Sequence, residues 1–487
     1  MEQINDLVVA FSDFFWQWLL IPLLVILSIY FTVRLAGVQL RLIPDMIGTL
    51  RGAPEIAPDG KKSVSSFQAF SISAAARIGT GNVVGVAGAI AVGGPGAVFW
   101  MWIMALLVGA ASFVESTLAQ LYKVRDKAGF RGGPAYYMQQ GLGARWLGVI
   151  FAITITFTFG FVFNAVQSNT ISGAVAGSVE ATGAEVPGWL APLVGVLVVA
   201  LTALVIFGGV RRIAQTSAML VPFMAALYIV MGLVVVGLNA DQIPAVFAMI
   251  VKSAFGIEQF AGATIGTVIV QGVRRGMFSN EAGLGSAPNA AASASVSHPV
   301  KQGLVQTFGV YFDTLVICSM TAFVILVSNP TYGEERGPLL TQEALESSLG
   351  TWSLHLLTVI LLLLAYSSVL GNYYYGEANV GFMNSSPGVM NGFKVAFLVA
   401  TFLGSIGSVQ IVWSLADLTM GIMALVNLVT LAPLAGIAAL VLKDYVAQRK
   451  QGIDPVFTRD RLPQLRGIEC WEPREEREGS TEQTTAQ

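Results

Sequence analysis

The feature that most constrains the fold of this chain is a series of apolar runs, each about 20 residues long, the length of a helix that crosses a bilayer. Only 11% of the 487 residues are charged, whereas soluble globular proteins have about 25%. Backbone groups inside a bilayer must pair within the protein, so these runs should be helical. The sequence therefore predicts an all-α polytopic membrane protein with eleven transmembrane helices, at residues 14–34, 67–92, 96–122, 146–178, 189–208, 216–238, 262–296, 302–328, 353–376, 393–408 and 412–442.

Lysine and arginine are distributed unevenly between the loops that join these spans. If the loop after the first span is placed inside, the inside segments hold most of the 27 lysines and arginines, and the outside segments hold only Lys252 and Arg336. Cytoplasmic loops carry the excess of positive charge in membrane proteins. We therefore expect a multi-pass protein of the plasma (cytoplasmic) membrane, with its N-terminus outside and its C-terminus cytoplasmic.

Two of the predicted spans carry residues that weaken a helix at mid-membrane depth. Ser66–Gly94 contains the sequence IGTGN at Ile78–Asn82, and Thr264–Val296 contains FSNEAGLGS at Phe278–Ser286. Each glycine costs about 1 kcal/mol of helix stability relative to alanine. Irregular backbone at this depth is tolerated only where protein covers it or where it lines a wet cavity. We therefore predict a broken helix at each position, with free backbone groups able to bind a ligand.

The position of the two breaks suggests an internal repeat. Without the first span, ten spans remain, and the first span of each group of five carries a break. Because five is odd, the second group must lie upside down relative to the first, as in the inverted repeats of secondary transporters. The predicted domains are an N-terminal helix and cytoplasmic loop, two inverted repeats and a polar tail that we expect to be solvated and disordered, at residues 1–66, 67–238, 239–442 and 443–487.

The first break offers oxygen ligands and backbone amides. The side-chain oxygen of Asn82 and the carbonyls freed around Ile78–Gly81 are hard donors that suit an alkali cation, and the helix that follows presents its positive end to a carboxylate. The alternative is that the small residues only allow close helix packing. A dinucleotide-binding reading of GTGNVVG fails because no βαβ unit surrounds it.

The second break mixes apolar, polar and charged residues. Phe278 can close an apolar wall over a substrate, and Ser279 and Asn280 offer hydrogen-bonding groups. Glu281 is a carboxylate at membrane depth, where such groups usually face a cavity or a partner. We favour a structural ion pair between Glu281 and one of three arginines over direct substrate contact; they are Arg77, Arg274 and Arg275.

Three further groups of polar residues fall inside predicted spans. Gln167 lies on the 146–178 helix with Asn164 and Asn169. These side chains either line a cavity shared with the two breaks or bond to a neighbouring helix. Ser367 and Ser368 either complete a sodium site that faces Ala75 and Ile78 or bond back to their own helix. The remaining carboxylates are expected to satisfy neighbouring backbone or arginine groups, although one could relay protons; they are Glu115, Asp313 and Asp417.

Several other classes of protein are disfavoured. The net charge is −2, without a basic block that would indicate nucleic-acid binding. Cys318 and Cys470 lie in different contexts, as do His298 and His355, so we expect neither a disulfide nor a Cys–His metal site. The chain has no nucleophile elbow and no HExxH motif, so no enzyme is expected. A channel would need a continuous polar pore or a repeated filter loop, and neither is evident.

Eight motifs closely resemble those of the alanine or glycine:cation symporter family, the sodium:alanine symporters. They extend from about residue 67 to 380 and read FQAF, ARIGTGNVVGVA, GGPGAVFWMW, GGPAYYM, NAVQSNTIS, RGMFSNEAGLGSAPNA, HPVKQGLVQTFGVYFDT and YYYGEAN. The resemblance implies a leucine-transporter-type core of ten helices plus one N-terminal helix. It also implies a set of substrate contacts and a sodium site: Ile78, Gly79, Thr80, Gly81, Asn82, Gln167, Phe278, Ser279 and Asn280 for the substrate, and Ala75, Ile78, Ser367 and Ser368 for sodium.

One departure from the family pattern affects the predicted pocket. Similar alanine carriers usually read LGWYYYG, whereas this chain has Leu370-Gly371-Asn372 before the tyrosines. By the same resemblance, Gly371 and Asn372 would line the substrate pocket. Asn372 removes apolar bulk and adds hydrogen-bonding groups, which can discriminate between substrates more sharply than a change in size. We hypothesise a substrate larger or more polar than alanine, such as glutamine or asparagine.

The predicted function is sodium-coupled symport of a small neutral amino acid (alanine, glycine or glutamine) by alternating access. No cofactor is expected, and sodium is the coupling ion. The near alternative is a proton-coupled carrier, with Glu281 or Asp313 as the titrating group. The expected partners are the amino acid, sodium and the lipid bilayer, with no nucleic acid. The sequence sets no oligomeric state and is compatible with a monomer.

Overall fold

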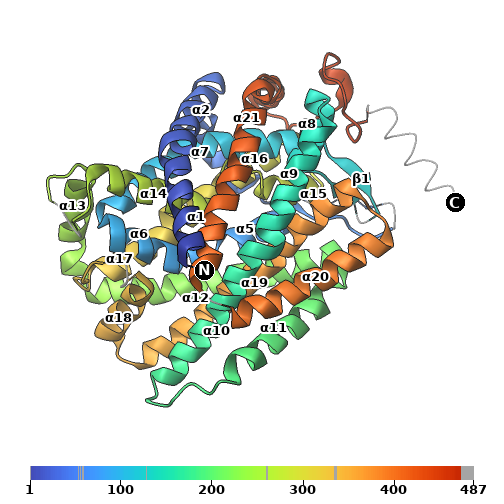
Figure 1. Ribbon diagram of the computed structural model, residues 1–487. Coiled ribbons are helices and arrows are strands. Elements are labelled where there is room, and N and C mark those ends of the chain that lie inside the picture. The colour runs from blue at the N-terminus through green and yellow to red at the C-terminus, as the bar shows by residue number, and fades with distance from the viewer. Residues whose placement is uncertain are drawn as a thin grey trace.

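The computed structural model describes residues 2–52, 54, 56–57, 60–127, 129–258, 262–333, 337–407 and 409–472. Helices dominate, joined by short loops and one β-hairpin (Figure 1). In chain order the first half contains α1 (Glu2–Phe15), η1 (Trp16–Leu20), α2 (Ile21–Arg34), α3 (Val38–Arg41), α4 (Ile43–Gly48), α5 (Ser66–Arg77), η2 (Gly81–Gly85), α6 (Val86–Gly93), α7 (Gly96–Leu121), β1 (Val124–Asp126), β2 (Gly129–Arg131), α8 (Pro134–Leu142), α9 (Arg145–Phe157), η3 (Thr158–Phe163), α10 (Asn164–Glu180), α11 (Leu190–Ile206) and α12 (Gly209–Leu238).

The second half contains a similar succession of long and short helices. Its elements are η4 (Ala240–Gln242), α13 (Ile243–Ala254), α14 (Ile265–Asn280), α15 (Ala287–Ser293), α16 (Pro299–Tyr311), η5 (Phe312–Cys318), α17 (Ser319–Leu326), α18 (Gly337–Leu349), α19 (Trp352–Met383), α20 (Pro387–Ile406), α21 (Val409–Lys450) and η7 (Arg459–Arg461). The elements η1, η2, η3 and η5 are single π-helical turns between α-helical segments. Such turns often occur at functional sites.

Eight helical segments of the described residues are long and apolar enough to cross a membrane, and one bent pair of helices raises the number to nine. The bent pair is Ser66–Arg77 with Gly81–Gly93, at 51°. The predicted spans at 189–208 and 262–296 fall outside these nine. The first contains α11, which has only 17 residues. The second is divided between α14 and α15, which have 16 and 7 residues.

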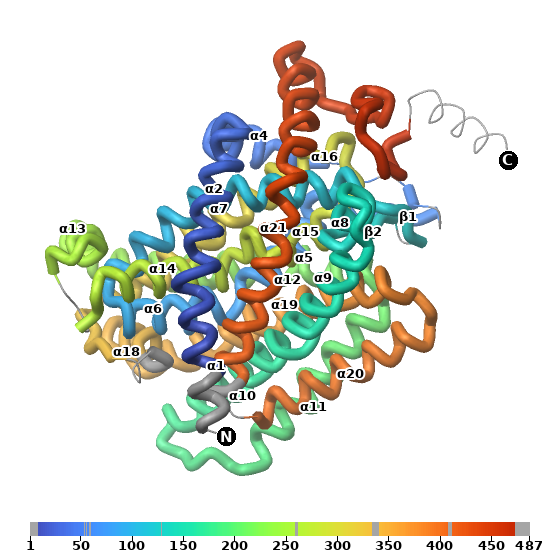
Figure 2. Tube along the Cα trace, turned by 45° about the horizontal axis from the view of Figure 1, so that its top comes forward, coloured from blue at the N-terminus to red at the C-terminus, as the bar shows by residue number. Residues whose placement is uncertain are grey.

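The long helices pack so that apolar side chains also face outward. The pair α7 and α16 runs through the middle of the molecule, α1 and α2 lie beside α21, and α11 packs on α20 at the periphery (Figures 1 and 2). Outward faces of α11, α12 and α20 carry exposed leucine, valine and phenylalanine, as a bilayer requires; examples are Leu197, Leu201, Leu204, Phe223, Val234, Val395 and Leu403.

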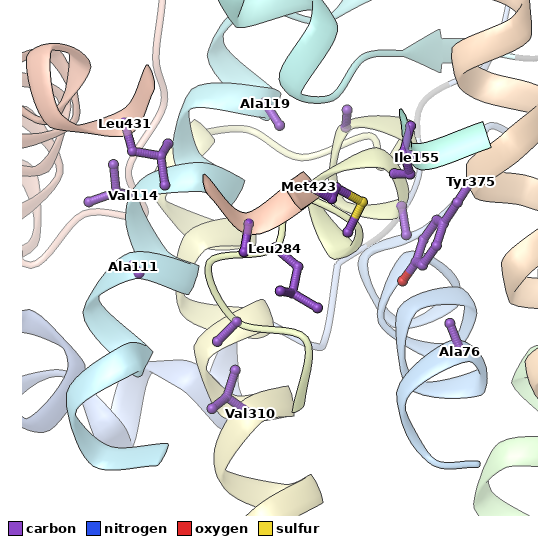
Figure 3. Packing of buried hydrophobic residues seen from close by; sticks show 14 of the residues in the cluster. Ala76, Ala111, Val114, Ala119, Ile155, Leu284, Val310, Tyr375, Met423 and Leu431 are labelled. Carbon is purple, nitrogen blue, oxygen red and sulfur yellow. The ribbon is translucent and has the colours of Figure 1, made fainter. Parts of the chain in front are cut away.

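The segment between α14 and α15 lies inside the protein rather than against lipid. Leu284 from this segment is completely buried and packs in one core cluster with Ala111 of α7, Val310 of α16 and Met423 of α21 (Figure 3). Irregular backbone at membrane depth is stable under this condition, because protein groups can satisfy its polar atoms.

The C-terminal region differs from the prediction of a solvated, disordered tail from residue 443 onward. The helix α21 continues to Lys450, and residues 451–472 pack back on the protein, with Phe457 and Trp471 almost fully buried. The prediction of disorder was wrong for 443–472 because these apolar anchors are isolated within a charged sequence, although many residues of this region are exposed as predicted; residues 473–487 lie outside the described part of the chain.

Candidate functional site

The first predicted break is confirmed. The helix α5 ends at Arg77, with Ile78 as its C-cap in a non-helical conformation (φ −79°, ψ 80°), and helix resumes at Gly81. The Gly79 amide donates to Oδ1 of Asn82 at 2.9 Å and to the Arg77 carbonyl at 2.9 Å. It therefore does not bond to the carbonyl of Ala75, its partner in a continuous helix. The break frees that oxygen for another partner.

The second break is also confirmed, but it begins later than predicted. Phe278, Ser279 and Asn280 form the last turn of α14, and the irregular segment is 281–286. Glu281 adopts a left-handed conformation (φ 56°), which ends the helix, and Gly283 (φ 78°) has the positive φ that glycine favours. The predicted binding residues of this region thus lie on a helix end rather than in the loop.

The two breaks lie against each other. A Cβ atom at Gly81 would lie 2.9 Å from the ring of Phe278 and 3.6 Å from Cα of Ser279. Only glycine at position 81 permits this approach.

Asp313 of η5 links the two breaks. Its carboxylate accepts hydrogen bonds from Nδ2 of Asn82 at 2.6 Å and from Oγ of Ser279 at 2.7 Å. The sequence analysis named Asp313 only as a carboxylate that satisfies neighbouring groups or titrates in a proton-coupled carrier, and its link between the two breaks was not predicted. Its role becomes visible only when residues more than 200 positions apart are brought together.

Glu115 of α7 satisfies the backbone freed by the second break. Its two carboxylate oxygens accept from the amides of Gly283 and Gly285, each at 3.1 Å, and one also accepts from Nδ2 of Asn427 at 2.8 Å. The expectation that Glu115 satisfies neighbouring backbone is confirmed.

The favoured ion pair of Glu281 is not formed. Its carboxylate accepts from the hydroxyl of Ser286 at 2.6 Å, and within the described residues it pairs with no arginine. Arg274 and Arg275 instead pair with Asp417, and Arg274 also pairs with Asp13. These arginines point away from the break because α14 turns them toward α1 and α21.

Three oxygen atoms of the predicted sodium site lie together, those of the Ser367 and Ser368 hydroxyls and of the Ala75 carbonyl. The hydroxyls of Ser368 and Ser367 donate to the Ala75 carbonyl at 2.9 and 3.4 Å. Both serines and Ala75 are fully buried, and Ile78 caps the same helix end. Both serines also donate to the Leu364 carbonyl of their own helix, so the predicted back-bonding is confirmed, and the sodium site stays a prediction. Hydroxyl and carbonyl oxygens are the ligands that a hard cation takes, so these residues fit a sodium ion.

Gln167 lies at the first break, whereas its two neighbours do not. Its Oε1 accepts from the Thr80 amide at 3.4 Å, and its amide lies beside Gly79. Asn164 donates to Thr401 and to the Phe397 carbonyl, and Asn169 donates to the carbonyls of Gly404 and Gly407. For these two asparagines the interpretation as bonds to a neighbouring helix is therefore correct.

Asn372 lies on α19 one helical turn after Ser368, and within the described residues its side chain has no hydrogen-bond partner. It lies on α19 between Ser368, which contacts the first broken segment, and Tyr375, which is packed in the core (Figure 3). Gly371 beside it packs on the backbone of Ala76, where a Cβ would be 2.8 Å from the amide nitrogen. Asn372 is fully buried, and neither its side-chain nitrogen nor its side-chain oxygen is hydrogen-bonded to any residue that the structure describes. Because unpaired buried amides cost free energy, this group is suited to a ligand.

An aromatic stack covers the end of α14. The ring of Phe278 is stacked between Phe163 at 4.7 Å and Trp413 at 5.2 Å, and the guanidinium of Arg275 lies over Phe278 and Trp413. Phe278 is therefore part of an apolar aromatic stack, its predicted contact with a substrate stays a prediction, and Phe163 and Trp413 were not identified from the sequence.

Comparison with known proteins gives a consistent result. The model of the sodium:alanine symporter family matches residues 1–459. The chain is 51% identical to the amino-acid carrier protein AlsT of Bacillus subtilis, covering 96% of this chain and 98% of that protein. It is 50% identical to the probable sodium/glutamine symporter GlnT of the same organism, covering 97% of each chain.

A more distant relative and a solved structure extend the comparison. The sodium/alanine symporter AgcS of Methanococcus maripaludis is 37% identical over 91% of this chain and 98% of that protein. The crystal structure of MhsT in complex with L-phenylalanine has a TM-score of 0.57 at 12% identity, covering 79% of this chain and 99% of that chain, a likeness of fold alone. The match over nearly the full length establishes that the chain belongs to the sodium:alanine symporter family.

Proposed function

We propose that the protein is a sodium-coupled symporter that carries a small neutral amino acid across the membrane by alternating access. The observation that carries this proposal is the contact between the two broken helices, at the break after α5 and the end of α14. This contact brings freed backbone groups and polar side chains together inside the helix bundle. Discontinuous helices that meet at one site are typical of secondary transporters. The family and the names of its members support amino-acid symport rather than an enzyme.

The proposal includes a membrane arrangement. We place α11 and the α14–α15 segment across the bilayer as well, which gives eleven spans and a 5+5 inverted repeat. The corresponding domains are 1–66, 67–238, 239–442 and 443–487. We place the protein in the plasma membrane, with its N-terminus outside and its C-terminus in the cytoplasm. The distribution of lysine and arginine between the loops favours this orientation.

The proposed substrate site combines both breaks with α10 and α19. The amide-rich start of η2 binds the substrate carboxylate, and Phe278 covers the side chain. The contributing residues are Ile78, Gly79, Thr80, Gly81, Asn82, Gln167, Phe278, Ser279, Asn280, Gly371 and Asn372. The unpaired amide of Asn372 supports a substrate with a side-chain carboxamide, such as glutamine, over alanine or glycine.

The proposed sodium site couples the ion to the substrate. Sodium would bind to the carbonyls of Ala75 and Ile78 and to the hydroxyls of Ser367 and Ser368, replacing the hydrogen bonds these hydroxyls now make to Ala75. Bound sodium would fix the end of α5 against α19 and so pre-form the substrate site. This is coupling by differential affinity, since each ligand binds more tightly to the conformation that the other stabilises.

Uptake into proteoliposomes tests the proposal. An inward sodium gradient should drive accumulation of radiolabelled glutamine above alanine and glycine, and a potassium gradient should not. Ser368→Ala should raise the sodium concentration for half-maximal uptake by about tenfold, while Ser353→Ala, near the start of the same helix, should leave it unchanged. An uptake rate that is the same with and without a sodium gradient at fixed pH contradicts the proposal.

A proton-coupled carrier is the second candidate. Asp313 favours it, because this buried carboxylate forms no ion pair within the described residues and touches both breaks. Uptake that follows a pH gradient in the absence of sodium, and that Asp313→Asn abolishes, would establish proton coupling instead.

A further inference from the structure

Residues 451–472, which we call the C-terminal strap, dock on one end of the helix bundle. The strap (dark red) follows α21 and lies beside α8 and the β-hairpin (Figures 1 and 2). The side chain of Glu469 bonds to Gln140 of α8 at 2.7 Å, and Glu472 pairs with Arg125 of β1 at 2.6 Å. The strap is thus held by specific contacts and not only by its connection to α21.

The first anchor of the strap is Trp471. Its indole N–H donates to the Gln120 carbonyl at 3.2 Å, and the ammonium of Lys123 lies 4.6 Å from its ring. Gln120 and Lys123 in turn donate to the carbonyl of Ala294, at 2.9 and 3.0 Å, directly after α15. Trp471 therefore covers the two side chains that hold the end of the second broken helix.

The second anchor is Phe457, which holds the linker between α15 and α16. The Phe457 amide donates to the Ser297 carbonyl, and the Ser297 hydroxyl donates to the Pro455 carbonyl, both at 2.8 Å. One residue further, the His298 ring packs edge-on against Phe457. The rings of Phe457 and Trp471 also meet edge-on, so the two anchors form one unit.

The space beside this unit is not closely packed. A polar cavity of about 540 Å³ lies between α4 with the residues after it, the start of α5, the 295–297 linker and the end of α21, and Asp454 is the strap residue that lines it. The start of α5 and the linker after α15 therefore border a space into which the linker can move once the strap no longer holds it.

We propose that the C-terminal strap is a latch that keeps the face carrying the C-terminus closed, and that it releases whenever the transport site opens toward that face. Opening requires the half-helix α15 to move, since alternating access rearranges broken helices around a fixed site. The strap stabilises only the closed position, because its two anchors bind the residues that follow and support α15.

The strap contains its own reporter, Cys470. This thiol is 4% exposed, and burial raises its pKa to about 11. Since the thiolate is the reactive form, Cys470 should react slowly with maleimides while the strap is docked. Its labelling rate then measures how often the strap opens.

Labelling of the reconstituted full-length protein tests the latch. N-ethylmaleimide incorporation at Cys470, quantified by peptide mass spectrometry, should be several-fold faster during amino-acid uptake than at rest. Trp471→Ala should raise the resting rate at least tenfold, and Cys470→Ala should remove the signal.

Two truncations test the effect on transport. Removal of 451–487 should speed efflux of preloaded amino acid several-fold, whereas removal of 473–487 alone, which keeps the strap, should not. If wild-type Cys470 is labelled at the same rate at rest and during uptake, the strap is a static brace and the latch proposal is overturned. This test remains valid even if the protein that lacks 451–487 fails to fold. If the protein shows no sodium-driven uptake, the proposed function is contradicted and not the docking of the strap. Docking is still measured by the resting labelling rate of Cys470 in Trp471→Ala.

Discussion

Three buried carboxylates near the breaks accept hydrogen bonds from N–H and O–H donors, and none of them pairs with a lysine or arginine within the described part of the chain. Glu115 accepts two backbone amides and one side-chain amide, Glu281 accepts a hydroxyl, and Asp313 accepts an amide and a hydroxyl from different helices. Hydrogen bonds to charged groups are about twice as strong as those between neutral groups. Each carboxylate can therefore fix a segment that has no regular helical hydrogen bonds.

Replacement of Glu115 should destabilise the second break. Glu115→Ala leaves the amides of Gly283 and Gly285 buried without an acceptor, at a cost of about 1–3 kcal/mol for each. Glu115→Gln should be milder, because its carbonyl oxygen still accepts one amide. Thermal unfolding in detergent should rank the proteins as wild type, then Gln, then Ala. An equal melting temperature for Ala and wild type would contradict this role, and Glu180→Ala, at the exposed end of α10, is the matched control.

The long, continuous helix α19 contacts the short helices α5 and α15 and so helps to fix their positions. Its Ser368 contacts Ala75 of α5, and further along its Asn379 donates to Oδ1 of Asn289 in α15 at 2.9 Å. A seven-residue helix such as α15 is unstable alone, so its position depends on such contacts and on the strap. We therefore expect the junction between α15 and α16 to be sensitive to its surroundings.

His298 at this junction should make stability depend on pH. Burial lowers its pKa below the ordinary 6.5, despite the hydrogen bond to Asp444; Lys301 and Arg461 lower it further. The unfolded chain then binds more protons than the folded protein below pH 6.5, so stability should be full above that pH and fall as the pH decreases toward the folded pKa.

Melting temperatures between pH 7.5 and 5 measure this effect. His298→Asn, which can still cap α16, should reduce the pH-dependent loss, whereas His355→Asn, at an exposed position, should retain it. An unchanged pH profile in His298→Asn would show that other groups cause the dependence.

At the scale of the whole molecule, the sequence predicted the parts that depend on local composition. The break at Gly79–Asn82 was predictable because two glycines and an asparagine interrupt an apolar run. The link through Asp313 was not, since it joins segments far apart in the chain. The docking of Trp471 was missed for a related reason: one aromatic residue in a charged segment has no periodicity that distinguishes an anchor from a solvated side chain.

The number of membrane crossings can be decided at α11. Its 17 residues extend about 26 Å at 1.5 Å per residue, close to the roughly 30 Å of the hydrocarbon core. If α11 crosses the membrane, the loops on its two sides lie on opposite faces. The positive charge of Arg211 and Arg212 after α11 then marks the cytoplasmic side.

Cysteine labelling with a membrane-impermeant maleimide tests this arrangement in intact cells. We expect Ala184→Cys, before α11, to be labelled from outside, and Arg212→Cys, after α11, to be labelled only when the membrane is permeabilised. Both positions are exposed, and the native Cys318 and Cys470 are buried, so the unmodified protein provides a low background. Labelling of both introduced cysteines from the same side would show that α11 does not cross, and the inverted repeat would then lose one of its ten helices.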